Sequence, residues 1–269
     1  MAILSILKQS LGLLWKEPKI FIPKLITTSL YTAVMIFLAG IASQMAEATN
    51  YFSGGALSPP DPSVVEGLLA DLAIVLVSTL FLLLADLISY AMYPALIRDH
   101  NEKRPISLSG ALKEAFGAWR ILATIGAAVI LFAIVGGIFM VPFEVMTIRT
   151  GNVSFYLFAA LVMLAAALSL LVILFFVVPV GVVEKKGVVD AFRHGFSLSM
   201  RHKKDLFAIN VFFLILTSAT FAILVVAESQ GYGMMEASSI ALFVLVRVVQ
   251  AVMYTYISVV NPYFYIAVR

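Results

Sequence analysis

The sequence contains no cysteine, and only 12% of its 269 residues are charged. Without cysteine, neither a disulfide framework nor a thiolate metal site or nucleophile is available. Soluble domains have about 25% charged and roughly 45 to 50% apolar residues, whereas this chain is 62% apolar with a mean hydropathy of +1.05. Too little polar surface remains to coat a water-soluble core. These scarcities exclude an ordinary soluble enzyme and indicate an integral membrane protein.

Long apolar runs predict where the chain crosses the membrane, because a helix needs roughly 20 apolar residues to span the hydrocarbon core. Four runs carry no charged residue. Of two further runs, one contains Asp71 and Asp86 and the other contains Arg247. The six predicted spans cover residues 25–46, 68–97, 121–143, 150–183, 206–227 and 237–268. The runs are continuously apolar rather than alternating, which favours helices over strands. We expect an all-α integral membrane protein, with residues 1–269 as a single membrane domain.

Lysine and arginine lie almost entirely on one side of this predicted topology. All of them except Arg149 and Arg247 fall before the first span, between the second and third, between the fourth and fifth, or at the C-terminus. Short loops rich in these residues stay in the cytoplasm. The pattern predicts a multi-pass protein of the inner or plasma membrane with both termini cytoplasmic. Nucleic-acid binding is not expected, since the basic residues are spread over membrane-adjacent segments without a reading motif.

A short amphipathic segment precedes each of the first, third and fifth predicted spans, and such helices lie in the headgroup plane of a membrane. Trp15 and Trp119, the two tryptophans of the chain, stand at the ends of the first two segments, as expected at a membrane–water boundary. The apolar positions are Ile3, Leu4, Leu7, Leu11 and Leu14 in the first segment, Leu108, Ala111, Leu112, Ala115, Phe116 and Trp119 in the second, and Val188, Phe192, Phe196 and Met200 in the third.

The three segments share an order of apolar, apolar, basic, polar, small and apolar residues at 6–11, 111–116 and 191–196. One proline also lies late in each even span, at positions 94, 179 and 262. This pattern is typical of parallel repeats, here modules 1–97, 98–183 and 184–269, each with one interfacial helix and two spans. Apolar helices of similar composition would look alike without any repeat, so both interpretations stay open.

Residues 179–193, PVGVVEKKGVVDAFR, resemble a signature of poorly characterised prokaryotic multi-span proteins. Those proteins are similar to the membrane domain of glycerophosphodiester phosphodiesterases. The likeness covers mainly residues 179–215, and Gly195 stands where the pattern more often has serine. The resemblance implies a helical membrane module. It carries over no catalytic residue, because the phosphodiesterase chemistry of that family belongs to a separate soluble domain.

Polar side chains inside the predicted spans are the candidates for a site, because a charged residue at the bilayer centre costs at least about 2.5 to 3.5 kcal/mol. We expect their faces to turn inward and line a cavity open toward the cytoplasm, with Asp86 as a cation or proton site. The alternative is that they join helices through interhelical hydrogen bonds. The cavity candidates are Asp86, Asn210, Arg247, Gln250, Tyr254 and Asn261.

A second set of candidates is the basic segment between the fourth and fifth spans, which would meet anionic lipid headgroups. Two functions are therefore predicted. The first is a small transporter or permeation protein, and the second is a non-catalytic scaffold or lipid-organising protein that binds lipids or partner proteins. A second copy of the chain is one such partner. The headgroup candidates are Lys185, Lys186, Arg193, Arg201, Lys203 and Lys204.

Catalytic chemistry is not predicted. The three histidines, His100, His194 and His202, all lie in predicted cytoplasmic segments and lack the spacing of a metal site. No glycine-rich phosphate loop is present, nor is there a serine, histidine and aspartate grouping at one depth. We expect neither an enzyme nor a bound metal or cofactor.

Overall fold

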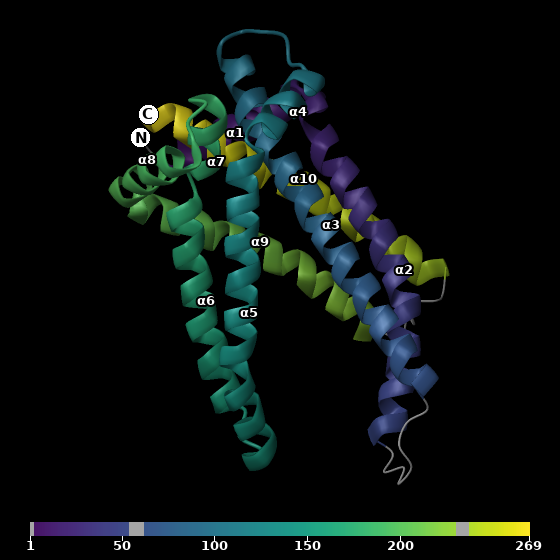
Figure 1. Cartoon of the computed structure of the whole chain (residues 1–269). Coiled ribbons are helices and arrows are strands. Elements are labelled where there is room, and N and C mark those ends of the chain that lie inside the picture. Colours follow the sequence, from purple (N-terminus) through teal and green to yellow (C-terminus); the bar gives the residue numbers. More distant parts are fainter. Residues whose placement is uncertain (1–2, 54–61, 230–236) are drawn as a thin grey trace.

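The computed structural model describes residues 3–53, 62–229 and 237–269. Within these ranges it describes only the backbone of residues 39–40, 42–53, 62–65, 220–221, 223–229 and 237–240. All regular structure in these residues is helical, and Figure 1 shows long helices arranged side by side. The elements are α1 (Ile3–Lys16), the 3-10 helix η1 (Pro18–Phe21), α2 (Ile22–Ser53), α3 (Pro62–Asn101), α4 (Leu108–Gly117), α5 (Trp119–Thr150), α6 (Ser154–Leu174), α7 (Val177–Val183), α8 (Val188–Arg201), α9 (Lys203–Ser229) and α10 (Ala237–Val268).

Five helical stretches in the described residues are long and apolar enough to cross a membrane. They are Pro18–Leu38, Glu66–Asn101, Trp119–Thr150, Ser154–Val183 and Ala241–Val268. This agrees with a multi-pass membrane protein. The predicted span 206–227 falls within α9, whose side chains lie in part outside the described residues, so the sixth span stays a prediction.

The buried core lies at the end of the molecule that carries both termini (Figure 1). There the last turns of α3 and α10 meet the short helix α7. Tyr93 of α3, Phe176 beside α7 and Tyr265 of α10 are fully buried. Each of these three ends contains the proline of one predicted module, and each is covered by a short helix: α4 packs on α3, α8 on α7 and α1 on α10.

The three short helices α1, α4 and α8 correspond to the three predicted amphipathic segments. Their equivalent positions share the same exposure: Ile6, Ala111 and Ala191 are buried, as are Ser10, Ala115 and Gly195. Leu11, Phe116 and Phe196 are 49%, 53% and 47% exposed. The predicted apolar stripe is therefore divided, because one part of it packs on the core while Leu11, Phe116 and Phe196 face outward, where a membrane would cover them.

The predicted span 150–183 is a broken helix rather than a continuous one. It consists of α6 and α7 with a turn at Phe175 and Phe176. Pro179 has no backbone N–H, and its ring excludes the carbonyl of the residue four positions earlier, which is Phe175. The side-chain amide of Asn261 in α10 donates a hydrogen bond to that carbonyl at 2.7 Å. Asn261 thus satisfies the backbone group that the proline leaves without a helical partner.

Candidate ligand cavity

A cavity of about 550 Å³ lies between α2, α3 and α10. This volume is within the range of small-molecule sites. Its walls combine aliphatic and aromatic side chains with hydroxyls and three charged groups. The lining residues are Lys24, Thr27, Thr28, Tyr31, Met35, Leu38, Thr79, Leu82, Leu83, Asp86, Tyr90, Arg247, Tyr254, Ile257 and Ser258. Such a mixture suits a ligand that has both a polar and an apolar part.

Lys24 and Asp86 form an ion pair in the wall of the cavity. The Lys24 Nζ atom lies 2.5 Å from the Asp86 Oδ1 atom and donates a hydrogen bond to it. The lysine side chain is 5% exposed, whereas the aspartate side chain is 59% exposed. Asp86 therefore faces the open space, and the lysine approaches it from within the packed helices. The buried Lys24 ammonium thus neutralises the charge of the Asp86 carboxylate from the side of the packed helices.

Arg247 supplies a second cation to the same cavity from α10. Its guanidinium donates a hydrogen bond to the Gln250 side-chain oxygen at 2.7 Å. The guanidinium carbon lies 4.6 Å from the ring centre of Tyr31 and 4.8 Å from that of Phe243, within the range of cation–π attraction. The Arg247 Nε atom is buried and has no hydrogen-bond partner among the described residues. With Lys24 and Asp86, the three charged groups of the wall sum to one positive charge.

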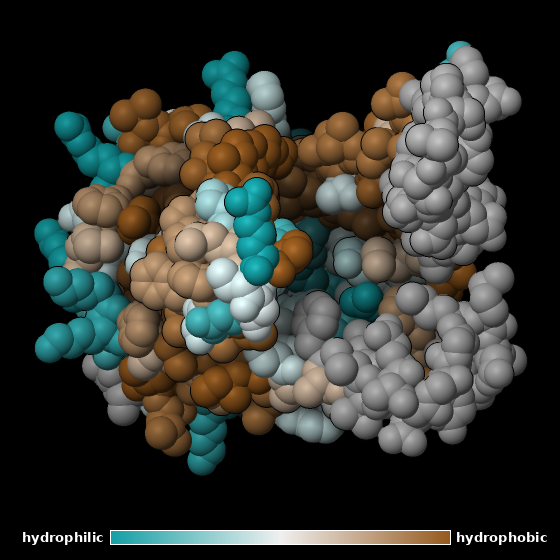
Figure 2. All heavy atoms as spheres, turned by 90° about the horizontal axis from the view of Figure 1, so that it is seen from below, coloured by the Kyte–Doolittle hydropathy of each residue, from teal (hydrophilic) through white to brown (hydrophobic). Residues whose placement is uncertain are grey.

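The cavity is closed toward the end that carries the termini. Ile20 and Tyr93 are fully buried there, and the Tyr93 hydroxyl donates to the Ile20 carbonyl at 3.2 Å. Figure 2 views the molecule from the opposite end and shows hydrophilic atoms inside a hollow bordered by apolar surface. The expectation of a cavity open toward the cytoplasm, combined with cytoplasmic termini, is therefore not met. The packed ends of α3, α7 and α10 occupy that side.

The structure separates the cavity residues predicted from the sequence into two groups. Asp86, Arg247 and Tyr254 line the cavity, and Gln250 supports it through Arg247. Asn210 and Asn261 are buried away from it. The Asn210 amide donates a hydrogen bond to the Leu206 carbonyl of its own helix at 2.9 Å, and the Asn261 amide donates one to the Phe175 carbonyl. Asn261 follows the alternative interpretation of an interhelical hydrogen bond, whereas the hydrogen bond of Asn210 stays within its own helix.

The partners of Asp86 and Arg247 in the cavity wall, Lys24 and Tyr31, were not among the predicted cavity residues. Lys24 was placed in the basic segment ahead of the first span, and Tyr31 was not singled out. The missed signal is spacing, because Lys24, Thr27, Thr28 and Tyr31 recur at steps of three and four and so share one face of α2. A lysine at the start of an apolar helix is ordinarily assigned to the headgroup region. For this reason its ion pair with Asp86 inside the helix group was not expected.

The headgroup candidates surround α8 on the side of the termini. Arg193, Arg201, Lys203 and Lys204 are exposed. Lys186 instead pairs with Glu184 at 2.5 Å, and the same carboxylate contacts His194 and the Tyr265 hydroxyl. Partial burial opposes the charged form of Glu184, but hydrogen bonds from Lys186 and Tyr265 and the charge of His194 outweigh it. The pKa of Glu184 is therefore lowered below its ordinary value.

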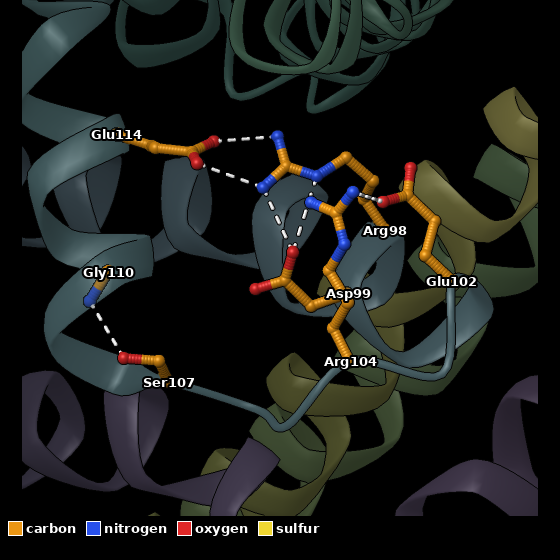
Figure 3. Close-up of polar contacts among 7 residues, drawn as sticks. All are labelled: Arg98, Asp99, Glu102, Arg104, Ser107, Gly110 and Glu114. Atoms are coloured by element: carbon orange, nitrogen blue, oxygen red, sulfur yellow. Dashed lines mark hydrogen bonds and ion pairs between the residues drawn. The ribbon is translucent and has the colours of Figure 1, made fainter.

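A second ion-pair group joins α3 to α4 (Figure 3). The Arg98 guanidinium donates to both carboxylate oxygens of Glu114 at 2.9 Å and to Asp99 at 3.0 Å. Such a two-point contact fixes the orientation of both side chains. The charge of Glu114 is thus compensated from the α3 side.

No group of histidines and carboxylates among the described residues has the arrangement of a metal site. No protein-family model, no curated protein and no solved structure matches this chain.

Proposed function

We propose that this protein is a small transporter or permeation protein whose α2–α3–α10 cavity receives the anionic end of an amphiphilic molecule. The observation that carries the proposal is the charge of the cavity, where Arg247 adds a cation beside the mutually neutralised pair of Lys24 and Asp86. An anion gains from this balance, whereas a cation at Asp86 would have to compete with the Lys24 ammonium at 2.5 Å. This argues for an anion in place of the cation or proton site expected from the sequence.

The apolar part of the ligand is inferred from the remaining walls. Met35, Leu38, Leu82 and Leu83 line the cavity beside the polar groups. Charged and polar residues inside a membrane face cavities that mark substrate pathways. With the termini in the cytoplasm, as the distribution of basic residues favours, the cavity opens toward the opposite leaflet. The proposed movement is therefore between that leaflet and the protein interior.

The test is the movement of a fluorescent phosphatidylglycerol across liposomes that contain the purified full chain. We expect the wild-type protein to accelerate its movement and Arg247→Gln to slow it by at least about tenfold, the equivalent of about 1.4 kcal/mol. The control is Arg149→Gln, which removes the same charge from an exposed position of α5. Wild-type rates in Arg247→Gln, or equal losses in both variants, contradict the proposal.

The second candidate function is a scaffold that binds anionic lipid or a membrane-protein partner through its basic side. The exposure of Arg193, Arg201, Lys203 and Lys204 favours it, because such clusters attract anionic headgroups. It predicts copurification of lipid or a partner that salt removes, with no acceleration of lipid movement. The likeness of residues 179–215 to a membrane domain and the three-module repeat both remain predictions. The matching exposure of α1, α4 and α8 supports the repeat.

A further inference from the structure

A second cavity, of about 760 Å³, lies where the α4–α5 corner faces the connection between α7 and α8. It is on the side of the termini and shares no lining residue with the α2–α3–α10 cavity. The lining residues are Gly110, Lys113, Glu114, Gly117, Ala118, Trp119, Arg120, Ile121, Gly181, Val182, Lys185, Lys186, Gly187 and Val188. We call it the corner pocket.

The corner pocket has an excess of positive charge. Lys113, Arg120, Lys185 and Lys186 line it together with one carboxylate, Glu114. That carboxylate is held on both oxygens by Arg98, and Lys186 is paired with Glu184. Within the described part of the chain, Lys113, Arg120 and Lys185 take part in no ion pair. Three cations from two separate parts of the chain thus line the corner pocket without an ion-pair partner among the described residues, and they outnumber its one carboxylate, Glu114.

The backbone of the corner pocket favours the close approach of a ligand. A Cβ atom added at Gly117 or Gly187 would meet nothing within 4 Å, so these two glycines border open space. Lys185 adopts a left-handed backbone conformation with φ of 54°, at a helix end where glycine is the usual residue. A lysine there costs roughly 1 kcal/mol of backbone strain.

The surroundings place the corner pocket at headgroup depth. Trp119 is 58% exposed, and the Arg120 guanidinium carbon lies 5.6 Å from the centre of its ring. Exposed tryptophan is typical of the membrane–water boundary. Leu112 and Phe116 extend the apolar surface of α4 outward, at 39% and 53% exposure. A ligand with its charge in the pocket would therefore have apolar surface beside it.

We infer that the corner pocket binds a phosphate monoester or diester group, as presented by the headgroup of an anionic phospholipid or by a soluble phosphate ester. Basic pockets between membrane helices on the cytoplasmic side bind such headgroups. The guanidinium of Arg120 and the two ammonium groups supply charge-assisted hydrogen bonds to the phosphate oxygens. This site is independent of the proposed transport function, since none of its residues lines the first cavity.

The experiment is native mass spectrometry of the detergent-purified full chain with three probes: phosphatidylglycerol, phosphatidylcholine and glycerol 3-phosphate. The test variant is the triple substitution Lys113→Gln, Arg120→Gln and Lys185→Gln. Its matched control is Lys8→Gln, Lys16→Gln and Lys19→Gln, which removes the same charge from exposed positions of α1 and η1 outside the pocket. We expect roughly fivefold weaker retention per cation removed, or on the order of a hundredfold for the test variant, and wild-type retention in the control.

The probes identify the source of the phosphate. Retention of phosphatidylglycerol alone assigns the corner pocket to an anionic lipid, and equal retention of glycerol 3-phosphate assigns it to a soluble phosphate ester. Gly117→Leu fills the open space without changing charge, and we expect at least about tenfold weaker retention in a protein that unfolds at the wild-type temperature. Equal losses in the two triple variants would mean that the net positive charge of the protein, and not the corner pocket, retains the lipid, which overturns the inference. Wild-type retention in the test variant overturns it as well.

Discussion

The packed end of the α2–α3–α10 group and the cavity nearer the middle of these helices differ in whether their polar groups are buried or exposed. At the end with the termini, Tyr93 and Asn261 are buried and each donates to a backbone carbonyl of another element. In the cavity nearer the middle of the helices, Asp86 keeps 59% of its side chain exposed while its partner Lys24 is buried. Hydrogen bonds between buried groups of different elements rigidify a core, whereas an exposed charge beside open space is available to a ligand. The first region maintains the fold, and the second can bind.

The largest expected effect comes from breaking the packed end at Gly195. A Cβ atom there would lie 3.0 Å from the backbone N and Cα atoms of Val177, and backbone cannot move aside cheaply. Gly195→Leu should lower the free energy of unfolding by at least about 3 kcal/mol because it separates α8 from α7. Thermal unfolding in detergent measures this. Gly12→Ala, where nothing lies within 4 Å, is the control and should keep or raise stability. Similar melting of the two variants would contradict the packing.

The second effect concerns the ion pair in the cavity wall. Asp86→Asn leaves the buried Lys24 ammonium without its counter-charge, which should cost on the order of 3 kcal/mol. Lys24→Met leaves a carboxylate that already faces open space, so its cost should be smaller. The unfolding midpoints of the two single variants and of the double variant measure the difference. The double variant should recover most of the loss, and a double variant as unstable as Asp86→Asn would show that the pair is not the cause.

A smaller effect is expected at the start of α4, on the edge of the packed end. The Ser107 hydroxyl accepts a hydrogen bond from the Gly110 backbone N–H at 3.1 Å (Figure 3) and caps the helix. Ser107→Ala should lower the free energy of unfolding by about 1 kcal/mol. Chemical unfolding in mixed micelles resolves such a change. Ser197→Ala, at an exposed position inside α8, is the control, and an equal loss there would remove the capping explanation.

The smallest effect is a dependence on pH in the cluster around Glu184. Because its pKa is lower in the folded protein than its ordinary value of 4.5, its contribution to stability is complete above pH 4.5. That contribution is lost as the pH falls through the lowered pKa of the folded state. The unfolding midpoint of the wild-type protein should therefore drop below pH 4.5, and Glu184→Gln should flatten this drop. Asp190→Asn, at an exposed position of α8 outside the cluster, should retain it.

Much of the architecture was predictable because it depends on local composition. Continuous apolar runs indicated helices long enough to span a membrane, and helical spacing located α1, α4 and α8 before each odd span. Pro179 indicated a kink or a helix end in the fourth span, but the position of the break between α6 and α7 was not predictable, because a proline shows only that a helix is disturbed nearby. The carbonyl that it frees is satisfied from α10, 86 positions away from Phe175, and no local pattern reports such a partner.

The candidate site was predicted only in part for the same reason. The sequence by itself determined that ionisable groups in apolar helices must find partners, since hydrocarbon does not solvate them. Only the tertiary structure decided which groups come together: Asp86 pairs with Lys24, Arg247 lies against Tyr31, and Lys113, Arg120 and Lys185 line one pocket. The apolar character of a helix is a property of neighbouring residues, whereas pairing depends on how helices far apart in the sequence pack together.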